Sequence, residues 1–249
     1  MKYSIVLCFS LVIISCQKNE NKLNSDAQAI IDQSIKVSGA DKYEKSTIRF
    51  NFRDKSYFAN RDNGIFELGR EFMQDNDTII DSFTNSKFTR LLNNKPVEVA
   101  DSMASKYTAS INSVHYFSKI PNGLNDTAVN KELLEEEAIS GEDYYKIKIS
   151  FTEDGGGEDF EDVFIYWIDK ETYKIKYLAY SYDEDDGKGM RFREAYNERY
   201  VNGIRFVDYN NYKTDDSMVP IYSLAKEFEK NKLNLLSKIE LNNIEVILN

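Results

Sequence analysis

Residue types that build many enzyme and metal sites are scarce in this chain of 249 residues. The two cysteines, Cys8 and Cys16, both lie close to the amino terminus, so neither a disulfide nor a cysteine nucleophile is available further along the chain. The single histidine, His115, has no second histidine to help it complete a transition-metal site. A lone histidine on a helix is more often a surface or hydrogen-bonded residue than a catalyst. We therefore expect no metal site, no cofactor and no catalytic role for His115.

Positive charge is also in short supply, because 32 lysines and arginines face 42 aspartates and glutamates, for a formal net charge of -10. The attraction to phosphate on which nucleic-acid binding depends is therefore missing. The hydrophobic content of 41% and the aromatic content of 13% are ample for a core, and the length suits one domain. We expect a single globular domain that does not bind nucleic acid.

The amino terminus has the pattern of a signal peptide. Lys2 precedes an apolar run, Ile5 to Ile14, that is too short to span a bilayer as a mature helix but suits the core of a signal sequence. The run ends in Ile13-Ile14-Ser15-Cys16, which resembles a bacterial lipobox. This resemblance implies cleavage between Ser15 and Cys16 and acylation of Cys16, with palmitate among the acyl chains. The alternative is an ordinary secretory signal that happens to carry a cysteine.

On this interpretation the chain divides into a signal peptide (1–15), a lipidated tether (16–24) and one domain (25–249). The tether is polar and has no hydrophobic period. Its first residues, Gln17 to Glu20, resemble signals that send Gram-negative lipoproteins to the outer membrane. Each buried acyl methylene contributes about 0.8 kcal/mol of membrane affinity, so lipid rather than charge provides the attachment. We expect a lipoprotein of the cell envelope whose partner is membrane lipid.

Two amphipathic helices are predicted. The first begins with a capping box at Ser25, covers 25–38 and ends where Gly39 supplies a left-handed residue. The second covers 102–120 and ends before Pro121, which cannot continue it.

Alternation of apolar and polar side chains predicts many short antiparallel strands. The densest run extends from Tyr144 to Tyr212, and its segment 163–168 is apolar on both faces, so we expect it to be covered on both sides. Two-residue hairpin signals occur at Asn63-Gly64 and at Asn202-Gly203. The acidic residues 135–137 are assigned to a solvated face, and a short helix is expected over 224–229. The segment 237–248 is predicted to be a last long strand or a strand pair. The other predicted strands lie near 48–52, 57–59, 65–68, 78–83, 87–92, 145–151, 163–168, 173–179 and 192–196.

The order of these elements resembles that of the LolA/LolB-like half-barrel lipoprotein carriers. The segments FTEDGGGED (151–159) and WIDKETYKIKYLAYSY (167–182) also resemble a group of uncharacterised bacterial outer-membrane-type lipoproteins. The resemblance implies an α+β fold that is mainly antiparallel β, with a curved sheet open as a half-barrel and helices covering its concave face. In LolA-like carriers this concavity accepts acyl chains.

A curved sheet rich in aromatic side chains cannot close its own concave face, so the two predicted helices must cover it, and any gap they leave is a pocket. We expect a hydrophobic or amphipathic ligand to bind there without catalysis. The alternative is that the same side chains simply fill a core. The candidate lining residues are Trp167, Tyr166, Phe164, Tyr177, Met103 and Ile111.

Two other functions stay open at this point. An envelope protein-interaction module could use a sheet edge or the acidic loops, and a hydrolase could use a pair of carboxylates that no motif selects. Neither a G-x-S-x-G elbow nor a P-loop occurs, so we expect a protein that is not an enzyme. The acidic segments 153–162 and 183–187 could hold calcium, but their spacing matches no EF-hand.

Overall fold

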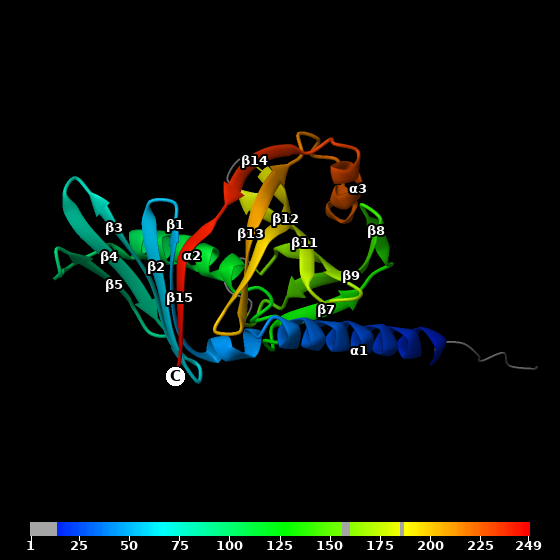
Figure 1. The fold of residues 1–249 in the computed structure, drawn as a ribbon, viewed down its shortest axis with the longest axis horizontal. Helices are drawn as coiled ribbons and strands as arrows, with labels where there is room; N and C mark the ends of the chain where they lie inside the picture. Colours follow the sequence, from blue (N-terminus) through cyan, green and yellow to red (C-terminus); the bar gives the residue numbers. More distant parts are fainter. Residues whose placement is uncertain (1–13, 156–159, 185–186) are drawn as a thin grey trace, which may run out of the picture.

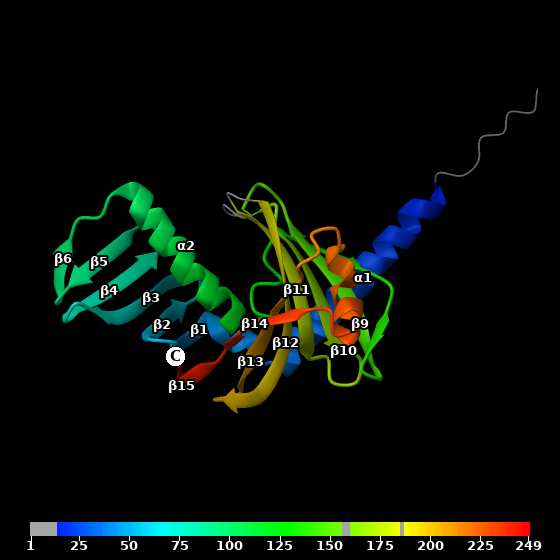
Figure 2. The ribbon, with the colours of Figure 1, turned by 90° about the horizontal axis from the view of Figure 1, so that it is seen from above.

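The computed structural model describes residues 14–155, 160–184 and 187–249. Two antiparallel sheets dominate the fold and lie side by side, with helices packed against them (Figures 1 and 2). Both sheets are open, and helices are few, so the predicted class is confirmed: α+β, mainly antiparallel β. The strands form two sheets, however, where the sequence suggested one curved sheet.

The first sheet has seven strands in the order β15-β1-β2-β3-β4-β5-β6. Its predicted hairpin at Asn63-Gly64 is present, and both residues have positive φ angles, 50° and 87°, as a two-residue hairpin loop of this kind requires. The strands are β1 (Lys45–Phe52), β2 (Lys55–Asp62), β3 (Ile65–Gln74), β4 (Asp77–Thr84), β5 (Phe88–Leu92), β6 (Lys95–Val97) and β15 (Leu241–Leu248).

The second sheet has eight strands, seven of them in the order β14-β13-β12-β11-β10-β9-β7, with β8 also paired to β9. The predicted hairpin at Asn202-Gly203 joins β12 to β13, again through two residues with positive φ angles, 48° and 75°. The strands are β7 (Val129–Leu133), β8 (Glu137–Ile139), β9 (Glu142–Phe151), β10 (Val163–Asp169), β11 (Ile175–Glu184), β12 (Gly187–Val201), β13 (Ile204–Lys213) and β14 (Asn234–Ile239).

The carboxy-terminal residues connect the two sheets. The segment predicted as a last strand or strand pair is a pair, in which β14 extends the second sheet beside β13 and β15 extends the first sheet beside β1. At the crossing, the backbone N–H of Leu241 donates to Asp208 Oδ1 over 3.0 Å, and Arg199 donates to the same carboxylate over 2.9 Å. Arg199 also donates to the carbonyl oxygen of Leu241, so both members of this ion pair hold the crossing strand to the second sheet.

Three α-helices and two short 3-10 helices complete the described residues. Helix α2 runs from the first sheet to the second (Figures 1 and 2), and its bounds agree with the predicted second helix. The short helix predicted over 224–229 is α3. The bounds are α1 (Ile14–Val37), η1 (Ala40–Glu44), α2 (Asp101–Ser118), η2 (Ile221–Ser223) and α3 (Leu224–Glu229).

Helix α1 differs from its prediction at one end and agrees at the other. It begins at Ile14 rather than Ser25, so the residues predicted as a tether are helical. The stretch lacks glycine and proline, and a helix already nucleated extends through such a stretch at little cost. Gly39 follows the helix with a φ of 60°, as predicted, and a Cβ there would meet the carbonyl oxygen of Gly203 at 1.9 Å. Only glycine fits this approach of α1 to the β12–β13 hairpin.

Two hydrophobic clusters cover the two faces of the second sheet. The larger lies on its inner face, where Phe164, Tyr166 and Ile168 of β10 meet α1, α2 and the first sheet. The smaller lies on the outer face, where Ile165 and Trp167 meet residues of α3. The prediction that 163–168 is covered on both sides is therefore confirmed, because successive side chains of a strand point to opposite faces.

Candidate functional site

A cavity of about 370 Å³ lies between the carboxy-terminal half of α2, the loop that follows it and the inner face of the second sheet. This volume is within the range of small-molecule sites, about 300–1,000 Å³. Of the described helices only α2 contributes to the wall, so the gap lies under α2 and its following loop and not, as predicted, under two helices. Its wall is formed by Ala109, Asn112, Ser113, Tyr116, Phe117, Lys119, Ile120, Gly123, Leu124, Asp126, Ala128, Val129, Phe151, Gly155, Asp162, Phe164, Leu178, Tyr180 and Arg193.

Aromatic rings make up the sheet side of the cavity. Phe164 of β10 stacks on Tyr180 of β11 with ring centroids 5.5 Å apart, because the two residues are opposite each other in the strand register. Tyr116 of α2 lies 5.4 Å from the same phenylalanine ring, and Phe151 of β9 lies 6.0 Å from it. Each aromatic pair adds about 0.5–1.5 kcal/mol beyond area burial, so this wall is a fixed apolar surface.

Two tyrosine hydroxyls meet behind the wall. The hydroxyl oxygens of Tyr116 and Tyr166 are 3.3 Å apart and share a hydrogen bond. Burial raises the pKa of Tyr116 to about 12, and burial also raises the pKa of Tyr166. Both rings are therefore neutral at physiological pH and add polarity without charge.

Lys119 and Asp126 lie together at one side of the cavity. A Cβ on Gly123 would lie 3.3 Å from the Lys119 ammonium nitrogen and 3.5 Å from Asp126 Oδ2, so both charges face the same glycine. Burial lowers the pKa of Lys119 and nearby Arg61 lowers it further, while Asp126 partly offsets both effects. This side of the cavity thus holds charges of both signs.

Arg193 of β12 lies in the sheet wall. Its Nη2 donates to the hydroxyl of Tyr180 over 2.8 Å and its Nε donates to Asn211 Oδ1 over 3.5 Å. The guanidinium carbon lies 5.1 Å from the ring centroid of Phe117 and 4.8 Å from that of Tyr180. Among the residues that the structure describes, no carboxylate forms an ion pair with Arg193.

The structure separates the six predicted lining residues. Phe164 lines the cavity, and Tyr166 lies directly behind it in the same cluster. Trp167 and Tyr177 point to the outer face and belong to the other cluster. In addition, Ile111 is fully buried in the inner core, whereas Met103, near the start of α2, is 39% exposed. The ligand contact predicted for Phe164 stays a prediction.

Sequence patterns overlooked the polar residues of the cavity. Arg193 alternates with Phe192 along β12, so the burial of Phe192 on the outer face puts Arg193 on the inner one. This alternation was readable, but the position of Tyr180 beside Arg193 depends on strand register, which no local pattern specifies. Lys119 lies just beyond α2 and shows no sequence signal.

His115 is hydrogen-bonded, as expected, but it is buried rather than at the surface. Its ring lies edge-on between those of Phe50 and Tyr57, with centroids 5.7 and 5.8 Å away. Nε2 is 3.3 Å from the carbonyl oxygen of Gly69, which can only accept, so this nitrogen carries the proton. Burial lowers the pKa of His115 to about 3. The residue lies outside the cavity wall and is neutral.

The acidic run 135–137 was assigned to a solvated face, and this is wrong for Glu137. Its carboxylate is 10% exposed and accepts from Lys146 over 2.7 Å and from the indole nitrogen of Trp167 over 2.9 Å. Lys146 also donates to the carbonyl oxygen of Tyr222 over 2.6 Å. The physical reason is the pairing of β8 with β9, which brings Glu137 over the outer face of the sheet. The group holds the η2–α3 segment in place.

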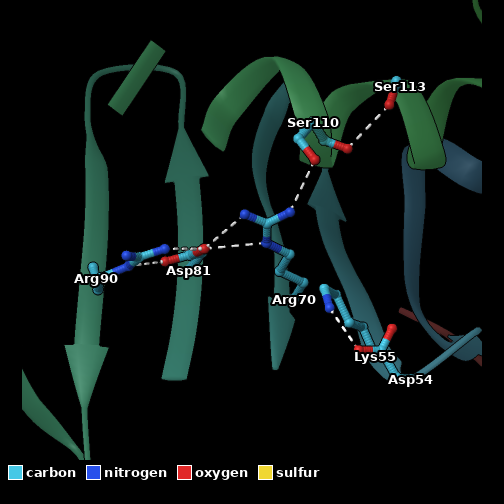
Figure 3. A network of polar contacts seen from close by, with 7 residues as sticks. All are labelled: Asp54, Lys55, Arg70, Asp81, Arg90, Ser110 and Ser113. Atoms are coloured by element: carbon cyan, nitrogen blue, oxygen red, sulfur yellow. Dashed lines mark hydrogen bonds and ion pairs between the residues drawn. The ribbon is translucent and has the colours of Figure 1, made fainter. Parts of the chain in front are cut away.

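A second charged network joins α2 to the first sheet (Figure 3). Asp81 of β4 is fully buried between Arg70 of β3 and Arg90 of β5, at 3.0 and 2.6 Å, because the three are opposite one another in the register. Arg70 also donates to Ser110 of α2 over 2.9 Å. The ring of Tyr107, one turn earlier on α2, covers the guanidinium of Arg90 at 4.0 Å. Both oxygens of Asp81 are already bonded, so this network is a structural clamp.

The acidic residues of the cavity wall do not favour hydrolysis by a pair of carboxyl groups. Asp126 and Asp162 both belong to its wall, but glycoside hydrolysis needs a carboxyl group kept protonated in a dry surrounding. Asp126 is exposed, and Asp162 is only half-buried. The described residues contain no group of three or more His, Cys, Asp or Glu side chains able to hold a metal ion. Residues 156–159 and 185–186 of the acidic segments considered for calcium lie outside the described residues.

Solved structures of similar fold share little sequence with this chain. A LolA superfamily protein from Nitrosomonas europaea is 12% identical with a TM-score of 0.42, over 89% of this chain and 91% of that one. A DUF1329 family protein from Desulfovibrio piger is 11% identical with a TM-score of 0.41, over 88% and 92%. A domain from Vibrio parahaemolyticus, named as an outer membrane lipoprotein-sorting protein, is 12% identical with a TM-score of 0.40, over 82% and 99%.

Sequence comparison assigns the chain to a family. No curated protein matches it. One family model does match, over residues 2–241, and its description is a family of unknown function, DUF6503. Because that match spans most of the chain, the protein belongs to the DUF6503 family.

Proposed function

We propose that this protein is a lipid-anchored protein of the cell envelope that holds a hydrophobic or amphipathic ligand in the cavity beside α2. The protein binds the ligand and does not transform it. The anchor is the acylated Cys16, and the cavity belongs to the domain that follows it.

The cavity itself is the observation that carries this proposal. Core side chains normally pack to the density of organic crystals, and voids much larger than a water molecule are few. The space of about 370 Å³ opens to solvent beside α2 and leaves apolar side chains such as Phe151 and Phe164 incompletely covered. Apolar surface that is left uncovered gains about 25 cal/mol per Å² when a hydrophobic ligand covers it.

Charged groups at the margin favour an amphipathic ligand over a wholly apolar one. Lys119, Asp126 and Arg193 share the cavity wall with the aromatic rings. A ligand with one polar end can leave these groups hydrogen-bonded, whereas a wholly apolar ligand would strip them of water without replacement.

Native mass spectrometry of the full chain, extracted from membranes in non-ionic detergent, tests the proposal. We expect a co-purified hydrophobic molecule on the wild-type protein. Ser113→Trp, on the exposed side of α2 at the cavity wall, should block entry and abolish that extra mass. Lys106→Trp is the matched control, because it adds the same ring at an exposed position of α2 outside the cavity.

A wild-type protein without any bound molecule would count against the proposal. So would a bound molecule that survives Ser113→Trp unchanged, because the ligand would then lie elsewhere. In both cases thermal unfolding of each variant must show that the fold is intact.

A further inference from the structure

We infer that the cavity recognises the oxyanion head, a carboxylate or a phosphate, of a single-chain amphiphile through the guanidinium group of Arg193. The inference rests on the proposed function, because it assigns the polar end of the ligand whose apolar part that function places in the cavity.

The guanidinium is held in one orientation before any ligand arrives. It lies against the rings of Phe117 and Tyr180, with its carbon 5.1 and 4.8 Å from their centroids. Hydrogen bonds to the hydroxyl of Tyr180 and to Asn211 fix its rotation. A planar, fixed fork of donors loses little entropy when it binds an oxyanion with two parallel hydrogen bonds.

The donor count leaves room for such a ligand. A guanidinium has five N–H donors, and Tyr180 and Asn211 accept from Nη2 and Nε, one donor each. The two donors on Nη1 and one on Nη2 have no described hydrogen-bond partner in the protein. Guanidinium N–H donors of this kind form two parallel hydrogen bonds to the oxygens of a carboxylate or a phosphate.

None of the ion pairs described in the structure includes Arg193. Asp126 lies beside Lys119, and the negative charge of Asp126 offsets the positive charge of Lys119. Four other arginines of the two sheets do form described ion pairs with carboxylates: Arg70, Arg90, Arg199 and Arg205.

The adjoining wall suits the rest of such a molecule. Arg193 is opposite Leu178 in the strand register, and Tyr180 is opposite Phe164 in the next pair of strands. From the guanidinium, the apolar surface therefore continues across the sheet through Tyr180 and Phe164 to Phe151. An amphiphile with its head at Arg193 can lay its chain along these rings.

Titration calorimetry on the full chain in phosphatidylcholine nanodiscs tests the inference, with empty nanodiscs as the blank. The probes are decanoate, decyl phosphate and decanol, which share one chain and differ in the head. We expect the two anions to bind the wild type about 10- to 100-fold more tightly than decanol, the usual gain from hydrogen bonds to a charged group. Arg193→Gln should remove that advantage and leave decanol binding unchanged.

Two further variants control for the loss of an arginine elsewhere and for the loss of charge alone. Arg191→Gln removes an arginine from the same face of the same strand, outside the cavity wall, and should bind all three probes like the wild type. Arg193→Lys keeps the charge but loses the fork, so its preference for the anions should be intermediate. If Arg193→Gln fails to fold, the Arg193→Lys result decides.

The outcomes distinguish the proposed function, ligand binding in the cavity, from the inference that Arg193 binds an oxyanion head. Failure of all three probes to bind contradicts the proposed function itself. Equal affinity for decanol and the anions, or an anion preference that survives Arg193→Gln, overturns the inference alone. Preference for only one of the two anions supports it and identifies which oxyanion the site takes.

Discussion

His115 lies between the rings of Phe50 and Tyr57 and donates to the carbonyl oxygen of Gly69. It is buried in the core, and no described carboxylate compensates a charge there. Burial therefore lowers the pKa of His115 to about 3, against an ordinary value of 6.5. The neutral ring is a packing residue of the junction between β1, β2 and α2.

This shift predicts a loss of stability in mild acid. In the folded protein His115 stays neutral down to about pH 3, whereas in the unfolded chain it takes up a proton below 6.5. The unfolded state therefore binds more protons between these values, and stability falls as pH decreases through this window. From pH 7 to pH 5 we expect a loss of about 2 kcal/mol from this residue. Urea unfolding at the two pH values measures it.

His115→Gln is the comparison for this prediction. Its amide can still donate to Gly69, but it does not titrate. The variant should lack the part of the pH dependence that belongs to His115. An equal loss of stability in both proteins would contradict the assignment.

At the scale of elements, α2 is the part that connects the first sheet to the cavity. Near its middle, α2 is clamped to that sheet by the hydrogen bond from Arg70 to Ser110 (Figure 3). The ring of Tyr107 adds to this clamp, and the carboxy-terminal half of α2 forms one cavity wall. The clamp depends on Asp81, which has no exposed surface and bonds both arginines. Removing a buried partner leaves charges without compensation.

Asp81→Asn should therefore destabilise the protein by about 3–5 kcal/mol, because Arg70 and Arg90 keep their buried positive charges. Asp54→Asn is the matched control, since the Asp54–Lys55 pair is close to the clamp but its carboxylate is 73% exposed. Exposed pairs contribute about 0–1 kcal/mol. Guanidinium unfolding of both variants measures the difference. Similar losses in the two would show that Asp81 is not a buried clamp.

At the scale of the whole molecule, the two sheets share a core, and the consecutive strands β14 and β15 connect them because each pairs with a different sheet. Within the described residues, none of the helices combines the length and apolar character needed to cross a membrane. The attachment to the envelope that we propose is through Cys16, near the start of α1.

Cys16→Ala should yield a protein that keeps its signal peptide and carries no acyl group, because the lipobox cysteine is the acceptor. Intact mass and palmitate labelling of the membrane fraction measure both features. Cys8→Ala is the matched control, since Cys8 lies inside the predicted signal peptide and should be removed with it. A Cys16→Ala protein that is still cleaved and still membrane-bound would contradict the lipid anchor.

Much of the local structure was predictable because short-range rules specify it. The helix stop at Gly39, the hairpins at Asn63-Gly64 and Asn202-Gly203 and the doubly buried strand β10 follow from backbone preference and apolar alternation. The start of α1 was missed because a polar stretch without glycine or proline has no stop signal. The cavity was predicted as a gap under the helices, but of its wall only Phe164 was named.

The amino-acid sequence by itself determined the turns, most strands, α2 and the signal-peptide pattern, because each depends on residues a few positions apart. The tertiary structure alone decided that strands β14 and β15 belong to different sheets and that Trp167 and Phe164 face opposite clusters. It also placed Arg193 beside Tyr180. Pairing partners are selected by the apolar surface that the whole chain buries together, and strand register then sets which distant side chains meet.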